Sequence, residues 1–333
     1  MRELILIVTD LFIAKGAAEP QSLPALPALS RLLMYARVES TGDWRRWVMR
    51  EFAAVRAGQA AVAAVSHRAT SAREPDPDSQ RHWWLATPVH LEADLTCVRM
   101  GARPLELSED EWHTIRTEFN QLFGADGFQL DAANGTGAFL AASGPIDAVT
   151  TDPMRVLGQD IAPSLPSGAA GSVLRRLMTG AQMWLYGHPL NEARTQRGVP
   201  TANALWIWGG GELPAASPVP AQLPQLFAGE AFLQGLWRML QGTIDARPPS
   251  FASLMAASCS HALVGLSAAS GTRSPVELLE AMDRDWMAPA LHALRRGRIG
   301  CIALHFNDRL FRVTQLDTFR LWRPHRYWLE TAA

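Results

Sequence analysis

The chain has 333 residues, of which 48% are hydrophobic and 19% charged, and its formal net charge is −1. This length and composition suffice to bury the core of one large domain or of two ordinary ones. The near-neutral charge argues against nucleic-acid binding, which requires a basic excess. The three cysteines lie far apart without a CxxC spacing, so neither a disulfide framework nor a zinc knuckle is indicated.

The apolar segments are too short for membrane insertion. No window reaches the roughly 18 apolar residues of a membrane span. The first apolar run, Leu4–Val8, is also too short for a signal-peptide core, and Asp10 follows it closely. We therefore expect a cytoplasmic protein with neither a membrane nor a nucleic acid as its partner.

The N-terminal segment is predicted to alternate strand and helix. Leu4–Val8 is a continuous β-prone run, which is typical of a parallel strand buried on both faces. Asp10 comes just past its end, where α/β proteins place their sites, although a turn or helix-cap role is equally compatible with that position. Helices are predicted over residues 27–38 and 44–55, the second capped by Asp43.

The middle of the chain has a different pattern. Residues 68–81 are polar and contain proline, which indicates a surface loop or hinge, and residues 82–100 predict one or two strands. Ser108 and Glu111 form a capping box that opens a helix ending at Gly124. A hairpin is predicted around Asn134-Gly135. This α+β pattern suggests an inserted domain.

The C-terminal part returns to strands and helices. Residues 143–171 are predicted as loop and 172–186 as helix. Further on, a strand at 261–267, a helix from 275 to 296 and a strand at 299–306 are expected. The predicted fold class is therefore α/β: a mostly parallel sheet core flanked by helices, formed by residues 1–67 and 212–333, with an inserted α+β domain at 68–211.

The richest stretch for ligand binding is residues 188–211. A short basic helix, a strand and three glycines follow one another there, so helix N–H groups, arginines and a glycine nest could hold a phosphate or carboxylate. The alternative is a solvated helix, a hydrogen-bonded asparagine and a glycine turn. The candidate anion-binding residues are His188, Asn191, Arg194, Arg197, Asn203, Gly209, Gly210 and Gly211.

Other signals of chemistry are weak. The nine histidines show no HxH, HxxxH or HExxH spacing, and the chain has no GxSxG or phosphate-binding P-loop motif. The 12 tryptophans could form a stacking platform, but core packing or a protein interface is the favoured interpretation. Catalytic residues are thus not identified from these patterns.

The segment 188–211 resembles the archaeal-type 2,3-bisphosphoglycerate-independent phosphoglycerate mutases, and more closely their bacterial relatives described as phosphoglycerate mutase-like or pathogenicity-regulation proteins. The opening residues 4–10 and 24–33 resemble the first strand and helix of that family, and residues 261–306 resemble its last core segment. The resemblance implies an alkaline-phosphatase-like core, two metal ions and a serine nucleophile. The matching residues are Gln182, His188, Pro189, Asn191, Arg194, Gly198, Ala202, Asn203, Trp206, Trp208, Gly209 and Gly211.

The chain departs from the family where the chemistry would occur. Asp10 matches the first metal ligand, but the Gly-Ser-Asp-Thr-Ala-type nucleophile segment has no counterpart near Ser40 and Thr41. The later ligands are replaced by LVGLSAASGTRS (263–274) and LHFND (304–308). With Asp10 as a vestigial candidate, we expect no metal cofactor and a catalytically inactive protein that binds an anionic small molecule or a protein partner.

Two alternatives remain open. The first is an active metal-dependent phosphoryl-transfer enzyme, a mutase or phosphatase, that holds Mn²⁺, Zn²⁺ or Mg²⁺ through rearranged ligands. Its candidate ligands are Asp10, Asp285, His305 and Asp308. The second is a protein–protein interaction module with tryptophans exposed at an interface.

Overall fold

The computed structural model describes residues 1–9, 24–53, 60–70, 82–134, 137–211, 213, 222–257, 259–267 and 275–320. The chain divides into two compact units, Met1–Arg56 with Ala216–Ala333, and Ala57–Ala215. This division differs from the expected boundaries at residues 68 and 211. Helix α3 (Val62–Thr70) packs on strand β3 (His82–Val89) of the second unit.

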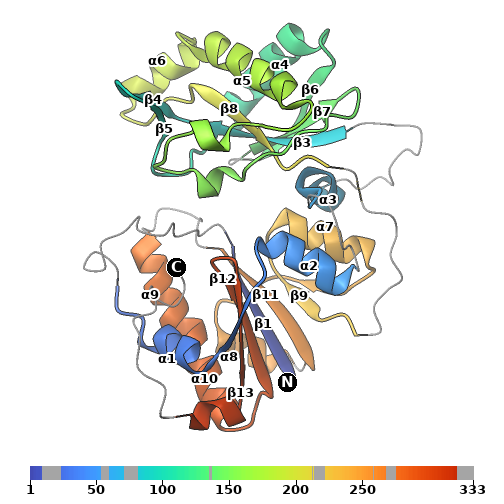
Figure 1. Cartoon of the computed structure of the whole chain (residues 1–333), viewed down its shortest axis with the longest axis vertical. Coiled ribbons are helices and arrows are strands. Elements are labelled where there is room, and N and C mark those ends of the chain that lie inside the picture. Colours follow the sequence, from blue (N-terminus) through green and yellow to red (C-terminus); the bar gives the residue numbers. More distant parts are fainter. Residues whose placement is uncertain are drawn as a thin grey trace. The chain divides into compact units, whose positions relative to one another are not determined.

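The first unit is built on a seven-stranded sheet with strand order β10-β9-β11-β1-β12-β13-β2 (Figure 1). The strands from β10 to β12 in this order all run parallel to one another. Strand β13 runs antiparallel to both of its neighbours, β12 and β2. The predicted mostly parallel α/β core is confirmed. The strands are β1 (Glu3–Thr9), β2 (Arg37–Ser40), β9 (Gln225–Phe227), β10 (Ile244–Asp245), β11 (His261–Ser267), β12 (Cys301–Phe306) and β13 (Arg309–Thr314).

Helices flank both faces of this sheet (Figure 1). Helices α1, α8, α9 and α10 share one hydrophobic cluster with the sheet, whereas α2 and α7 lie on the opposite face. The helices are α1 (Pro27–Tyr35), α2 (Trp44–Phe52), α7 (Ala231–Met239), α8 (Phe251–Ala256), α9 (Pro275–Met282), a π-helix (Asp283–Met287), α10 (Ala288–Arg295) and a 3₁₀ turn (Leu316–Phe319).

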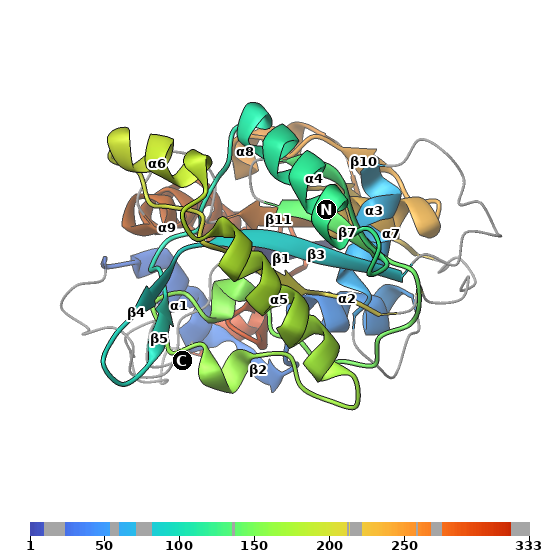
Figure 2. The ribbon, with the colours of Figure 1, turned by 90° about the horizontal axis from the view of Figure 1, so that it is seen from above.

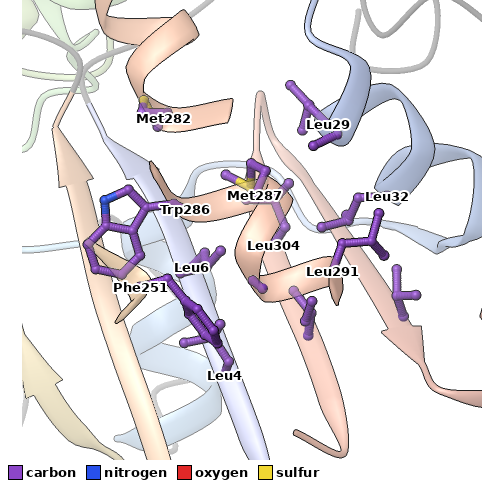
Figure 3. Packing of buried hydrophobic residues seen from close by; sticks show 14 of the residues in the cluster. Leu4, Leu6, Leu29, Leu32, Phe251, Met282, Trp286, Met287, Leu291 and Leu304 are labelled. Atoms are coloured by element: carbon purple, nitrogen blue, oxygen red, sulfur yellow. The ribbon is translucent and has the colours of Figure 1, made fainter. Parts of the chain in front are cut away.

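Strand β1 lies at the centre of the sheet and is buried on both faces. Leu4 and Leu6 point into the cluster that contains Trp286 and Leu291 (Figure 3). The alternate residue Ile7 points to the other face and has no exposed surface. This burial explains the continuous apolar run in the sequence.

The helix predicted over residues 275–296 is interrupted by the π-helix Asp283–Met287. Within it, the buried Asp283 carboxylate accepts hydrogen bonds from the backbone N–H of Ala28 (3.2 Å) and of Leu29 (2.6 Å). Helix α1 has no side-chain cap of its own, because Leu26 occupies its N-cap position. Asp283 therefore caps α1 from another element, a tertiary contact that periodicity does not reveal.

Two further elements differ from expectation. The helix predicted over residues 27–38 ends at Tyr35, and Arg37–Ser40 form the edge strand β2. Pairing of this segment with β13 overrides its helical pattern. In the second unit, residues 82–100 hold three strands instead of one or two, because β4 (Leu91–Ala93) and β5 (Val98–Met100) form a separate hairpin.

The second unit has an α+β architecture, as predicted. Its antiparallel sheet has strand order β6-β7-β3-β8, and helices α4 and α5 cross one face of it (Figure 2). The capping box of Ser108 and Glu111 forms at the start of α4. The remaining elements are α4 (Glu109–Phe123), β6 (Phe128–Asn134), β7 (Gly137–Ala142), 3₁₀ turns at Pro153–Arg155 and Ala162–Ser164, α5 (Gly171–Leu185), α6 (Pro189–Gln196) and β8 (Ala204–Trp208).

Candidate functional site

Asn191 lies at the centre of the 188–211 segment and is 8% exposed. Its amide donates to the carbonyl oxygens of Leu185 (3.0 Å) and Ala202 (3.1 Å), and its Oδ1 accepts from the Ala202 N–H (2.8 Å). Both N–H donors of the side chain are thus used. Asn191 connects the end of α5 to the segment that enters β8.

His188 and Asn203 also bind protein groups. His188 caps α6, with Nδ1 accepting from Leu190 N–H at 3.1 Å and Nε2 lying 3.0 Å from the Glu118 carboxylate. Asn203 makes two hydrogen bonds with the main chain of Leu91, at 2.7 and 2.8 Å. Each of these side chains stabilises a chain junction inside the second unit.

The two arginines converge on Glu111. Arg194 is buried and donates to Glu111 Oε2 (2.8 Å) and to the Pro200 carbonyl (2.7 Å), while Arg197 donates to Glu111 Oε1 (2.5 Å). Burial alone would raise the pKa of Glu111, but hydrogen bonds from Ser108 N–H and Arg197, together with Arg194, bring it below its usual value. An ionised Glu111 therefore balances positive charge that could otherwise attract an anion.

The three glycines allow close packing. A Cβ atom on Gly210 would lie 2.4 Å from ring atoms of Trp84, and one on Gly211 would lie 3.3 Å from Cα of Ala61. Gly209 adopts a φ of 71° and its N–H donates to Thr150 Oγ1 (3.1 Å). A side chain is excluded at Gly210 by contact, and is strained at Gly209 by conformation.

The polar side chains of residues 188–211 are therefore bound largely by other groups of the second unit. The glycines pack against Trp84 and the residues before α3, and of the two arginines only Arg197 has a mostly exposed side chain, at 54%. These contacts favour the structural alternative for this segment, with hydrogen-bonded asparagines and a glycine turn that join neighbouring elements. Anion binding here stays a prediction.

The carboxyl edge of the first unit's sheet holds a second group of polar residues. Asp10 lies outside the described residues. Its neighbour Thr9 donates to Glu230 Oε1 at 2.7 Å. A Cβ atom on Gly265 would lie 2.4 Å from Glu230 Oε2, so this glycine provides the space for the carboxylate. Glu230 was not predicted from the sequence; the glycine inside the apolar strand HALVGLS was the available signal.

His305, at the end of β12, is 1% exposed. Its Nε2 lies 2.8 Å from Thr41 Oγ1, and its ring packs against Trp47 with centroids 5.4 Å apart. The carbonyl of Asp308 accepts from Thr41 N–H (3.2 Å). Asn307 and Asp308 adopt φ values of 48° and 64°, as required by a type I′ turn between β12 and β13.

The four residues proposed as rearranged metal ligands do not form a described cluster. Asp285 makes two hydrogen bonds of 2.8 Å with its neighbour Arg284. Within the described ranges, no three or more His, Cys, Asp and Glu side chains are grouped so that they could hold a metal ion. Asp10, the fourth candidate ligand, lies outside these ranges.

Two further predictions concern membrane-spanning helices and the exposure of the tryptophans. In the described part of the chain, no helix combines the length and apolar character needed to cross a membrane. The tryptophans of this part are buried or half-buried, and none is exposed; Trp322 and Trp328 lie outside it. The described tryptophans thus pack mainly as core residues.

No protein-family model matches the chain. The 2,3-bisphosphoglycerate-independent phosphoglycerate mutase of Methanothrix thermoacetophila is 38% identical over 69 residues, which are 21% of this chain and 18% of that protein. The probable mutase of Geobacter sulfurreducens is 31% identical over 109 residues, or 32% of this chain and 27% of that protein. The matched segment therefore spans less than a third of these relatives.

The similarity between this chain and two solved structures is low. The cofactor-independent phosphoglycerate mutase of Thermoplasma acidophilum has a TM-score of 0.40 and 16% identity, covering 100% of this chain and 95% of that one. The PH0037 protein of Pyrococcus horikoshii has a TM-score of 0.44 and 14% identity, covering 94% and 87%. At such scores these structures support no inference about function.

The fold defines an α/β protein with a second, α+β unit. In sequence, the chain is similar over part of its length to the 2,3-bisphosphoglycerate-independent phosphoglycerate mutases. These relatives support the family resemblance found in its own residues.

Proposed function

We propose that this chain is a phosphoglycerate-mutase-like protein that acts by binding a protein partner and does not carry out metal-dependent phosphoryl transfer. The observation that carries the proposal is the contact between Thr41 and His305, at 2.8 Å. A two-metal site needs several carboxylates and imidazoles directed at the ions. Here the imidazole at the end of the last parallel strand is directed instead at a threonine hydroxyl.

The turn beyond β12 supports the same proposal. Asn307 and Asp308 form the two-residue connection to β13, and the Asp308 carbonyl accepts hydrogen bonds from the N–H groups of Thr41 and Gly42, at 3.2 and 3.1 Å. A segment shaped to close a hairpin and to anchor β2 serves the sheet. The main chain of this turn is therefore engaged in structure at the place where the family resemblance implies metal ligands.

In the second unit, we propose that residues 188–211 act as a joint rather than as an anion pocket. Glu111 accepts hydrogen bonds from both Arg194 and Arg197 and offsets one of their two charges. The amides of Asn191 and Asn203 bind main-chain groups. Titration with inorganic phosphate and 3-phosphoglycerate tests this part. Binding heat that is present in the wild type and absent in Arg197→Ala would favour the anion pocket instead.

The decisive experiment measures metal content and turnover together. The chain is equilibrated with Mn²⁺, Zn²⁺ or Mg²⁺, desalted and analysed by mass spectrometry for metals. It is then assayed with 3-phosphoglycerate and p-nitrophenyl phosphate, beside the Methanothrix thermoacetophila relative as a positive control. We expect less than one bound ion per chain and no turnover above the protein-free blank.

The second candidate function is metal-dependent phosphoryl transfer, which the names of the sequence relatives favour. Two stoichiometric ions, or turnover that Asp10→Ala abolishes and Asp245→Ala retains, would establish this alternative and refute the binding-only proposal. Asp245 is a suitable control because it is exposed in β10, the edge strand at the opposite end of the sheet from β2.

A further inference from the structure

The edge strand β2 presents an exposed surface. All four of its residues, Arg37–Ser40, are exposed, and in the described part of the chain β13 is its one strand neighbour. The first unit's exposed large apolar side chains, among described residues, are Val38 (48%), Leu316 (79%) and Phe319 (65%). Asp317, between the latter two in sequence, lies 3.7 Å from Arg37.

The backbone groups of β2 alternate in direction. Ser40 lies opposite Arg309 in the register, which places Thr41 opposite Asp308, and Thr41 N–H donates to the Asp308 carbonyl at 3.2 Å. Residues two apart in an antiparallel strand direct their N–H and C=O to the same side. Arg37 and Glu39 therefore bond to β13, whereas Val38 and Ser40 direct theirs to the open edge.

We propose that a second copy of this chain pairs with this edge, β2 against β2, antiparallel about a two-fold axis at Val38. Val38 N–H then donates to the carbonyl of Val38 of the partner subunit, and the partner's Val38 donates in return. Arg37 lies opposite Glu39 of the partner subunit, and this ion pair occurs twice. Cross-strand pairs of opposite charge stabilise a sheet, and like charges destabilise it.

The charges of Arg37 and Glu39 favour this register, and they favour a second copy of the chain as the strand that pairs with β2. Moving the axis to Arg37 places two arginines opposite each other, and moving it to Glu39 places two glutamates opposite each other. Only the axis at Val38 combines outward-directed backbone groups with opposite charges. A sequence that is complementary to itself in one register fits an isologous dimer.

A charge-swap experiment with the full chain tests the dimer by sedimentation equilibrium. Arg37→Glu gives a strand with two acids, and Glu39→Arg gives one with two arginines, so each variant repels itself. We expect the dimer dissociation constant to rise at least about tenfold for each variant alone. Mixed in equal amounts, the two variants match in both pairs, and a heterodimer of wild-type stability is expected.

Val38→Pro provides an independent variant. It removes the N–H that faces the open edge and leaves the N–H groups that bond to β13, so the fold is retained while the dimer is lost. Circular dichroism melting confirms that each variant is folded. A wild-type chain that is monomeric at its highest soluble concentration overturns the proposal. So does a dimer that all three variants retain, or a mixture of the two charge variants that stays monomeric.

Discussion

The hydroxyl of Thr41 lies 2.8 Å from Nε2 of His305, a residue 264 positions further along the chain. The contact joins the segment after edge strand β2 to the end of central strand β12. Because His305 is almost fully buried, the hydroxyl satisfies a polar group that water does not reach. This pair therefore stabilises the sheet at the edge where a catalytic group would be exposed.

Replacing Thr41 by valine is expected to lower the free energy of unfolding by about 1–2 kcal/mol, because a buried ring nitrogen loses its partner. Urea denaturation followed by tryptophan fluorescence measures the change. Ser40→Ala, at an exposed neighbouring hydroxyl, is the control and should leave stability unaltered. Equal effects of the two substitutions would contradict the role given to the Thr41–His305 contact.

Asn191→Ala is expected to cost about 2–4 kcal/mol, since it strips the Ala202 N–H of its partner and removes one hydrogen bond from each of the Leu185 and Ala202 carbonyls. The loss should appear in thermal unfolding monitored by circular dichroism. Gln196→Ala, an exposed position on the same helix, serves as the matched control. A variant as stable as the control would mean that the amide does not join α5 to β8.

Gly210→Ala tests the close approach to Trp84. The added methyl group would overlap ring atoms at 2.4 Å, so the second unit must shift, at a cost of about 1–3 kcal/mol. Gly144→Ala, where a Cβ atom meets nothing within 4 Å, should be tolerated. Chemical denaturation of both variants gives the comparison; a stable Gly210→Ala chain is incompatible with the packing described.

The pH dependence of the unfolding free energy should reveal the raised pKa of Asp283. Burial raises the pKa of Asp283, although hydrogen bonds from Leu29 and Ala28 oppose the shift. The folded chain then binds this proton more tightly than the unfolded chain, so the contribution of Asp283 is present at low pH and is lost as pH rises through the raised value. Relative to Asp283→Asn, the wild type should lose unfolding free energy over that range.

Asp317 supplies the control of opposite sign. Burial would raise its pKa, but hydrogen bonds from Thr314 and the charges of Arg320 and Arg37 lower it below the usual value. Its stabilising contribution is present above the unfolded-state pKa and is lost as the solution is acidified. Unfolding free energies of Asp317→Asn and the wild type should converge at low pH. If the unfolding free energies attributed to the two aspartates changed in the same direction with pH, the opposite pKa shifts of Asp283 and Asp317 would be refuted.

Local patterns in the sequence were sufficient to predict much of the fold. The apolar run Leu4–Val8 indicated a strand buried on both faces, and Ser108 with Glu111 indicated the start of α4. Both signals act over a few residues, so they survive without tertiary information. The edge strand Arg37–Ser40 was missed because its conformation depends on pairing with β13.

The contacts of the candidate site could be predicted less well from the sequence. The composition of residues 188–211 indicated ligand-binding groups, but it did not show that Glu111, from another helix, accepts from both arginines. Similarly, the spacing of Thr41 and His305 in the chain gives no sign of their contact. Which polar groups are engaged by protein partners is decided by the tertiary fold, and this determines whether they are available to a ligand.

The position of β1 has a consequence for biosynthesis. Its two sheet neighbours, β11 and β12, begin at His261 and Cys301, so a ribosome must translate most of the chain before this first strand can pair. The second unit, a single continuous stretch, can reach its native form much earlier. A nascent chain therefore carries the apolar strand β1 without its sheet partners during most of translation, and unpaired apolar strands of this kind are prone to aggregation.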